Sequence, residues 1–178
     1  GSDVSHVSQK ALKVAYQVGG EIAKAGAVLV TGGGEGVMKA ASQGAKEHNG
    51  LTVGILPGKA MNEANEYVDI VIPTGIGYSR DSTNANSSHG AIIVEGGVGT
   101  LSELTYCYLN KIPTVVMTNV PGVGVPYVGK YMDNRRLMKI KGAKDPAKAV
   151  AMIMAELKRQ GVFKKVKSIE HIRHNTFI

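Results

Sequence analysis

Two glycine-rich turns are the segments whose residue types and spacing could do chemistry. The first is "TGGGEG" at residues 31–36, and the second is "EGGVGT" at residues 95–100. Each turn follows a short apolar run and precedes a stretch that reads as a helix. Glycines let the backbone approach a ligand closely, and the first turn of a helix presents unpaired N–H groups to an anion. Both turns are therefore predicted to hold the phosphate group of a small molecule.

Neither turn is a known nucleotide-binding signature by itself. The Gly-Lys-Ser/Thr of a Walker loop is absent, and so is the spaced Gly-x-Gly-x-x-Gly of a dinucleotide site. The alternative interpretation is that both are simple tight connections between a strand and a helix. Glu103 raises a second question, because a carboxylate near a helix N-terminus is favourable on dipole grounds alone. The residue type and position of Glu103 are compatible both with a catalytic role and with a purely structural role at the helix N-terminus.

The elements that must position these turns alternate along the chain. Apolar residues at helical spacing predict helices, and short apolar runs that end at glycine or proline predict strands. We expect helices at about 11–22, 37–48, 78–88, 101–110 and 146–159, and strands at 27–30, 51–56, 68–72, 91–94 and 114–118. Continuous apolar strands are buried on both faces. The predicted fold class is therefore α/β, a Rossmann-like doubly wound parallel sheet with helices on both faces, which binds ligands beyond the carboxyl ends of its strands.

Length and charge indicate one domain with a basic tail. The 178 residues, 43% of them apolar, can bury one core, which we place at 1–160, with the tail at 161–178. Residues 1–138 hold 11 basic and 11 acidic side chains, whereas 139–178 hold 10 basic and 3 acidic ones, so the C-terminal part carries the whole net charge of +7. Without interleaved aromatic residues, a solvated helix face is favoured over nucleic-acid binding.

Several other functional classes find no support in the sequence. No apolar run approaches the roughly 20 residues of a membrane span. A single cysteine, Cys107, excludes an intramolecular disulfide, and with no secretory leader we expect a cytoplasmic protein. His171 and His174 lack partners at metal-ligand spacing, so we predict no metal site and no cofactor.

The N-terminal "GSDVSHVS" looks like the loop between a first strand and a first helix, yet no strand precedes it. Either Gly1-Ser2 is an expression scar, or the sequence begins where a first strand ends. In the second case a central position of the sheet would be left for the C-terminal segment or a partner to fill.

Four segments together resemble the Lonely Guy (LOG) family, once labelled possible lysine decarboxylases. They are "TGGGEGVMKAASQGA" at 31–45, "GILPG" at 54–58, Arg80, and "EGGVGTLSEL" at 95–104. The family typically has a Gly-Gly-Gly-x-x-Gly-Leu-Met turn, and an Arg-Lys pair 15 residues before a Pro-Gly-Gly-x-Gly-Thr-x-x-Glu turn. Here Arg80 lies 15 residues before Glu95, which takes the place of the proline, and Glu103 falls on the final Glu. The resemblance covers roughly residues 1–160.

The resemblance implies a nucleoside 5′-monophosphate phosphoribohydrolase, which releases a free base and ribose 5-phosphate. Cleavage builds positive charge on the ribose C1′, which the Glu103 carboxylate would stabilise, while Arg80 would hold the ribose or phosphate. Arg80 and Glu103 are thus the predicted catalytic residues. The predicted phosphate- or nucleotide-binding residues are Gly32, Gly33, Gly34, Gly36, Met38, Gly96, Gly97, Gly99 and Thr100. The resemblance also implies a homo-oligomer, a dimer or a tetramer.

Departures from the family pattern keep a second function open. Glu95 replaces the proline, Asp81 replaces the lysine after Arg80, and Ser102 replaces the first of two glutamates. A relative within the superfamily carries molybdenum cofactor, a phosphate-bearing pterin, and needs the same phosphate cradle without a catalytic carboxylate. The enzyme interpretation predicts that Glu103 and Arg80 face each other, whereas the carrier interpretation predicts a wide, basic pocket. Tyr78 could stack on a base or serve as a packing residue.

Overall fold

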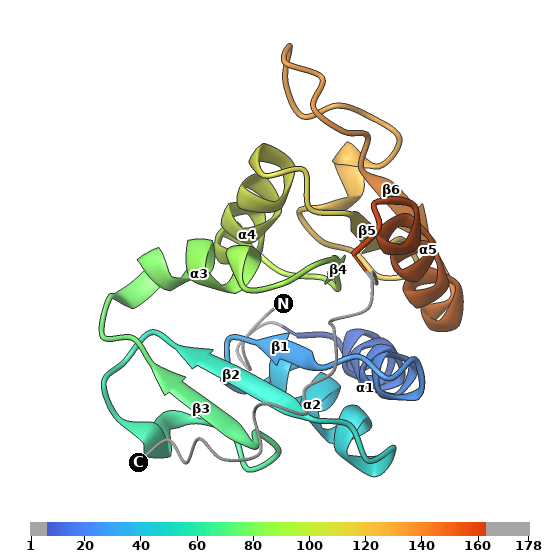
Figure 1. Ribbon diagram of the computed structural model, residues 1–178. Helices are drawn as coiled ribbons and strands as arrows, with labels where there is room; N and C mark the ends of the chain where they lie inside the picture. Colours follow the sequence, from blue (N-terminus) through green and yellow to red (C-terminus); the bar gives the residue numbers. More distant parts are fainter. Residues whose placement is uncertain (1–6, 163–178) are drawn as a thin grey trace.

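The computed structural model describes residues 7–162. Helices and strands alternate along this part of the chain (Figure 1). The helices are α1 (Gln9–Lys24), α2 (Val37–Glu47), α3 (Arg80–Asn86), α4 (Val98–Leu109) and α5 (Pro146–Arg159), and the strands are β1 (Leu29–Thr31), β2 (Thr52–Leu56), β3 (Ile70–Pro73), β4 (Ala91–Ile93), β5 (Thr114–Met117) and β6 (Lys141–Ala143). Short 3-10 turns lie at Met61–Glu63, Gly77–Ser79 and Val125–Tyr127.

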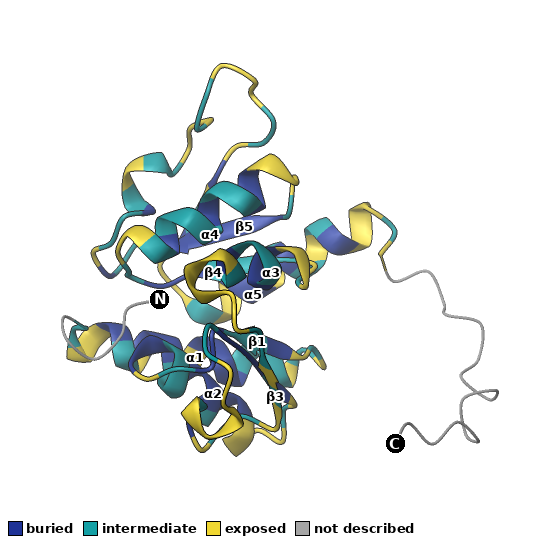
Figure 2. Cartoon of the chain, turned by 90° about the vertical axis from the view of Figure 1, so that its left-hand side faces the viewer, coloured by how far each residue is buried: buried dark blue, intermediate teal, exposed yellow. Residues whose placement is uncertain are grey.

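Every strand pair in this part of the chain is parallel, which confirms the expected α/β class. The strands form two three-stranded sheets, in the orders β1-β2-β3 and β4-β5-β6, rather than one continuous sheet. Figures 1 and 2 show β1 and β4 as the strands of each sheet that lie nearest the other sheet. The residues before Val7, where a first strand was considered, lie outside the described residues, as does the basic tail from 163 onward.

One apolar core joins the two sheets. It contains buried residues of α1, α2, β1, β5 and α5. A second apolar cluster lies under α4 and contains Ile93, Leu104, Tyr108, Val116 and Ile140. Successive β5 residues alternate between these cores, because side chains along a strand point to opposite faces. Val115 and Met117 belong to the first cluster and Val116 to the second, so helices cover both faces of β5 as predicted.

Helices α1 and α2 cross at two glycines. A Cβ built on Gly19 would lie 1.9 Å from the Ala41 carbonyl oxygen, and one built on Gly44 would lie 1.9 Å from the Tyr16 carbonyl oxygen. Each helix therefore places backbone directly against backbone of the other, which only glycine permits.

The structure refines several boundaries that affect the predicted site. Helix α4 begins at Val98, so Gly99 and Thr100 belong to its first turn. Helix α3 is shorter than expected and begins at Arg80. Strand β6, "KGA", was missed because it has no apolar run. No helix within residues 7–162 combines the length and apolar character that a membrane crossing requires.

Candidate functional site

The first glycine-rich turn connects β1 to α2 through left-handed backbone. Gly33 and Gly36 have φ values of 74° and 66°, and the Gly33 N–H donates to Thr31 Oγ1 at 3.0 Å. Gly36 is the N-cap of α2, so the turn ends where the helix presents its first N–H groups. Met38 packs against the turn, since a Cβ on Gly34 would lie 2.9 Å from the Met38 methyl carbon. The turn therefore has the left-handed backbone that glycine favours, and it ends at the N-terminus of α2.

Asn65 hydrogen-bonds to the backbone of this turn, and the sequence analysis did not predict this role. Its side chain is buried. The Nδ2 group donates to the Gly33 carbonyl at 3.0 Å and to the Gly34 carbonyl at 2.8 Å. The Asn65 backbone N–H donates to the same Gly33 carbonyl at 2.8 Å. Asn65 follows a polar stretch without periodicity, so no local pattern distinguishes it from an exposed loop asparagine.

Asn65→Ala is expected to lower the free energy of unfolding by about 1–3 kcal/mol, because the Gly34 carbonyl loses its side-chain donor and the Gly33 carbonyl keeps only the backbone N–H of residue 65. Urea unfolding of the variant measures this loss. Asn62→Ala, at an exposed position of the same loop, is the matched control and should change stability by less than about 0.5 kcal/mol. Equal stability of the two variants would contradict the bracing role.

The second turn connects β4 to α4 and is open at Gly97. Gly96 has a φ of 102°, and a Cβ there would lie 2.2 Å from Thr100 Oγ1, so this side of the turn is closed by the buried Thr100. Gly97 is the N-cap of α4. A Cβ on Gly97 would meet no atom within 4 Å. The backbone at Gly97 is therefore the accessible surface of this turn.

Glu95 turns its carboxylate to the start of α1. Its Oε2 accepts from the Ser8 N–H at 3.3 Å and from the Ser8 hydroxyl at 3.1 Å. Ser8 is the N-cap of α1, where a carboxylate is stabilised by the helix dipole. Glu95 itself adopts a φ of 51°. The acidic residue at the proline position of the LOG pattern thus connects the end of β4 to α1.

Arg80 contacts the first glycine-rich turn and Glu103 of α4. Arg80 Nη1 is 3.3 Å from Glu103 Oε1, and the two side chains are only 12% and 21% exposed. On its other side the guanidinium lies against the first turn, since a Cβ on Gly32 would be 2.6 Å from Arg80 Nη2. The packing of α3 on α4 produces this arrangement. The structure therefore brings together the two residues predicted to be catalytic.

Asn84 and Asp81 complete this cluster, although the sequence assigned neither of them a role. Asn84 Nδ2 donates to Glu103 Oε1 at 2.9 Å. Asp81 Oδ1 lies 3.2 Å from Arg80 Nη1, and burial raises the pKa of the Asp81 carboxyl, with a further rise from the charge of Glu103. Asn84 follows Arg80 by one helical turn, which was the only signal that could have indicated it.

Two buried polar atoms of the cluster lack a hydrogen-bond partner among the described residues. They are Arg80 Nε and Asn84 Oδ1, a donor and an acceptor from the same helix. Buried polar atoms are nearly always satisfied in proteins. Arg80 Nε and Asn84 Oδ1 can therefore each accommodate a further hydrogen bond.

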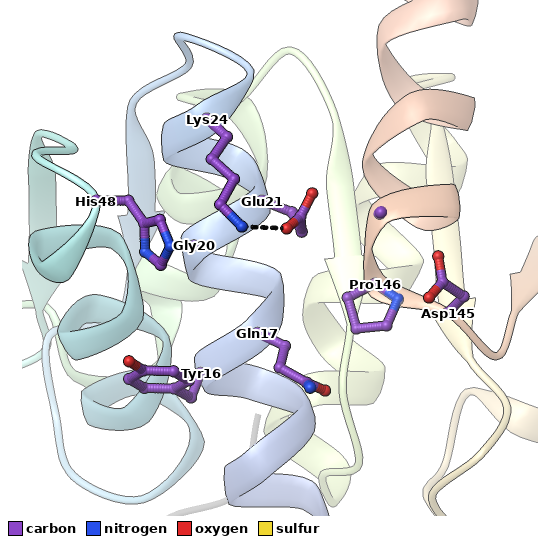
Figure 3. Close-up of a pocket in the computed structure, with 9 residues that line it drawn as sticks. Tyr16, Gln17, Gly20, Glu21, Lys24, His48, Asp145 and Pro146 are labelled. Atoms are coloured by element: carbon purple, nitrogen blue, oxygen red, sulfur yellow. Dashed lines mark hydrogen bonds and ion pairs between the residues drawn. The ribbon is translucent and has the colours of Figure 1, made fainter.

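Other features lie apart from this cluster. A pocket of about 260 Å³ is lined by residues of α1, the end of α2 and the start of α5, among them Tyr16, Glu21, Lys24 and His48 (Figure 3). It includes none of the predicted site residues. Burial raises the pKa of Cys107 to about 11, so this thiol is not a nucleophile near neutral pH. No group of three or more potential metal ligands occurs within residues 7–162.

Tyr78 is 85% exposed next to α3. It is therefore not a packing residue within the described part of the chain. Val98, at the start of α4, is equally exposed. Tyr78 lies two residues before Arg80, and Val98 lies five residues before Glu103.

The family model described as the SLOG cluster4 family matches residues 1–154. The chain belongs to the SLOG cluster4 family. This assignment agrees with the LOG resemblance of the glycine-rich turns.

Solved structures similar to this SLOG cluster4 chain include molybdenum cofactor proteins. The molybdenum cofactor binding protein from the phototrophic bacterium Rippkaea orientalis has 36% sequence identity and a TM-score of 0.77, over 85% of this chain and 91% of that one. The Moco carrier protein from Chlamydomonas reinhardtii has 33% identity and a TM-score of 0.76, over 89% of this chain and 94% of that one. The similarity extends over nearly the whole of both structures.

A curated relative with an enzymatic name matches less of the chain. The cytokinin riboside 5′-monophosphate phosphoribohydrolase of Mycobacterium marinum is 36% identical over 96 residues, 52% of this chain and 51% of the relative. The chain thus spans about half the length of this relative. A LOG enzyme is a partial relative, whereas the molybdenum cofactor proteins match over most of the chain.

Proposed function

We propose that this SLOG cluster4 protein binds a phosphate-bearing small molecule of the molybdenum cofactor type and acts as its carrier. The observation that carries this proposal is the position of Arg80, which contacts the first turn at Gly32 and the cluster after the second turn at Glu103. Arg80 therefore connects the first turn to α4, and in this proposal the ligand phosphate lies at Gly96–Thr100, where α4 begins. The extent of similarity to the molybdenum cofactor proteins supports this function over that of the partial LOG relative.

A direct binding measurement tests the carrier function. The purified chain is dialysed anaerobically against molybdenum cofactor released from a molybdoenzyme, and the bound molybdenum is quantified by mass spectrometry. We expect saturable binding that approaches one cofactor per chain. Retention no greater than that of a heat-unfolded sample would contradict the proposal.

A second candidate function is hydrolysis of a nucleoside 5′-monophosphate, favoured by one observation. Glu103 Oε1 receives both the Arg80 guanidinium and the Asn84 amide, at 3.3 and 2.9 Å. A carboxylate fixed by two donors is suited to stabilise positive charge on a ribose C1′. The enzyme interpretation predicts that Arg80 and Glu103 face each other, whereas the carrier interpretation predicts a wide, basic pocket.

Product analysis separates the two candidates. The chain is incubated with AMP and with a cytokinin riboside 5′-monophosphate, and free base is measured by chromatography. The carrier function predicts no more base from the native chain than from Glu103→Gln, which keeps the shape of the side chain. Base release that Glu103→Gln lowers by about a hundredfold or more would establish the hydrolase instead.

The homo-oligomer stays a prediction. Exposed apolar side chains of β3 and the segment after it supply a surface for it, namely Ile70, Ile72, Ile76 and Tyr78. Light scattering of the purified chain distinguishes a monomer from a dimer or a tetramer.

A further inference from the structure

Glu95, at the start of the second glycine-rich turn, adopts a backbone conformation that its residue type disfavours. Its φ of 51° lies in the left-handed region, where a side chain costs free energy and glycine is preferred. Proline cannot adopt this φ, because its ring fixes φ at about −65°. The turn therefore has a backbone at position 95 that the proline of the LOG pattern would not permit. A strained, non-glycine residue beside a candidate site indicates a role for its side chain.

The Glu95 carboxylate completes the N-terminal cap of α1. The Ser8 hydroxyl accepts from the Ala11 N–H at 3.1 Å and donates to Glu95 Oε2 at 3.1 Å. The Ser8 N–H donates to the same carboxylate oxygen at 3.3 Å. A displacement of the Glu95 side chain would therefore break two hydrogen bonds to α1 at once. This contact ties the second turn to a helix that begins 87 positions earlier in the chain.

The backbone of Glu95 is also in contact with the loop after β5. A Cβ built on Gly122 would lie 2.7 Å from the Glu95 Cα, and the Val123 N–H donates to the Gly96 carbonyl at 3.3 Å. Gly97, the exposed N-cap of α4, follows directly. The accessible backbone of Gly97 thus belongs to a segment whose position depends on α1, through Glu95, and on the loop after β5.

We propose that Glu95 is a positioning residue of the phosphate-binding turn, which acts through Ser8 to hold the backbone of Gly96 and Gly97 in the conformation that receives the ligand. This inference rests on the proposed phosphate-binding function of the same turn. It requires no contact between Glu95 and the ligand. Because coupling between two sites is reciprocal, a ligand at the turn stabilises the start of α1 by the same factor.

The sign of the effect on affinity distinguishes positioning from charge. The charge of a carboxylate beside an anion site acts against the anion, so its removal alone would raise the affinity. Positioning predicts the opposite, and we expect Glu95→Ala to bind AMP and molybdenum cofactor about tenfold more weakly than the native chain. Glu95→Gln keeps an acceptor oxygen for Ser8 and should stay within about threefold of the native affinity. Calorimetry measures the affinity for AMP, and equilibrium dialysis measures that for the cofactor.

Three further variants separate the side-chain contact from other effects. Glu95→Gly relieves the left-handed strain but removes the carboxylate, and should bind as weakly as Glu95→Ala. The double variant Ser8→Ala/Glu95→Ala should bind no more weakly than Glu95→Ala, because the two residues act through one contact. Glu21→Ala removes a carboxylate elsewhere on α1, where it pairs with Lys24, and should leave both affinities unchanged.

Hydrogen exchange gives a readout that a merely structural role would not change. The N–H groups of Ala11 and Leu12 donate to Ser8 in the first turn of α1. Saturating AMP should slow the exchange of these two amides by up to about tenfold in the native chain and leave it unchanged in Glu95→Ala. An equal effect of AMP on the two chains would contradict the coupling.

The outcomes distinguish this inference from the function on which it rests. If Glu95→Ala or Glu95→Gly binds both ligands as tightly as the native chain or more tightly, the positioning role is overturned. Additive losses from Ser8→Ala and Glu95→Ala would exclude action through Ser8. If the native chain binds neither AMP nor molybdenum cofactor, the proposed phosphate-binding function itself fails.

Discussion

Gly44→Ala is expected to lower the free energy of unfolding by about 3 kcal/mol or more, or to prevent folding, even though helix propensity alone predicts a gain of about 1 kcal/mol. The two effects have opposite signs, so the measurement decides between them. The added Cβ would lie 1.9 Å from the Tyr16 carbonyl oxygen, which belongs to the backbone of α1 and cannot move alone. Helices α1 and α2 would have to separate, and the core that joins the two sheets lies beneath them.

Urea unfolding followed by circular dichroism measures this effect. Gly19→Ala should behave alike, because its Cβ would lie 1.9 Å from the Ala41 carbonyl oxygen. Gly97→Ala is the control, since its Cβ would meet no atom within 4 Å and its φ of −107° suits alanine. Stability of Gly44→Ala equal to that of the native chain would mean that the helices cross less closely than described.

Gly97→Ala is expected to weaken binding of phosphate-bearing ligands by about tenfold or more while leaving stability within about 0.5 kcal/mol. The structure has room for the methyl group, so any loss of affinity reports the close approach of a ligand to this backbone. Calorimetric titration with AMP and dialysis with molybdenum cofactor measure the two affinities. Unchanged affinity for both would place the phosphate somewhere other than the second turn.

Gly26→Ala provides the matched comparison. Its Cβ would also meet no atom within 4 Å, but Gly26 has a φ of 71° in the turn that follows α1. This variant should lose about 1–2 kcal/mol of stability from backbone strain and keep its ligand affinity. Gly97→Ala is thus expected to weaken binding without changing stability. Gly26→Ala is expected to lower stability without changing binding.

The Arg80–Glu103 contact is compatible with both candidate functions, because a fixed ion pair can stabilise a reacting ribose or simply shape a binding site. What differs is the outcome for the ligand, because a hydrolase releases the free base whereas a carrier keeps its ligand intact. Product analysis with Glu103→Gln therefore separates the two functions.

Much of the framework was predictable from local patterns. Short apolar runs that end at glycine or proline indicated the strands β1 to β5, and apolar residues at a spacing of about 3.6 indicated the helices. The glycine-rich turns were predictable because positive φ and close backbone approach select glycine. The pairing of Arg80 with Glu103 was implied by the spacing of the LOG motifs. Strand β6 was not predictable, since its three residues carry no apolar pattern.

Local patterns in the amino-acid sequence indicated most of the elements and the two turns. The side chains that surround the turns follow instead from the packing of helices and sheets. Asn65 reaches Gly34 across 31 positions, and Glu95 reaches Ser8 across 87. The burial of Asp81 likewise depends on how α3 packs against α4. Contacts between residues so far apart depend on the packing of helices and sheets, and packing leaves no periodic signal at a single polar position.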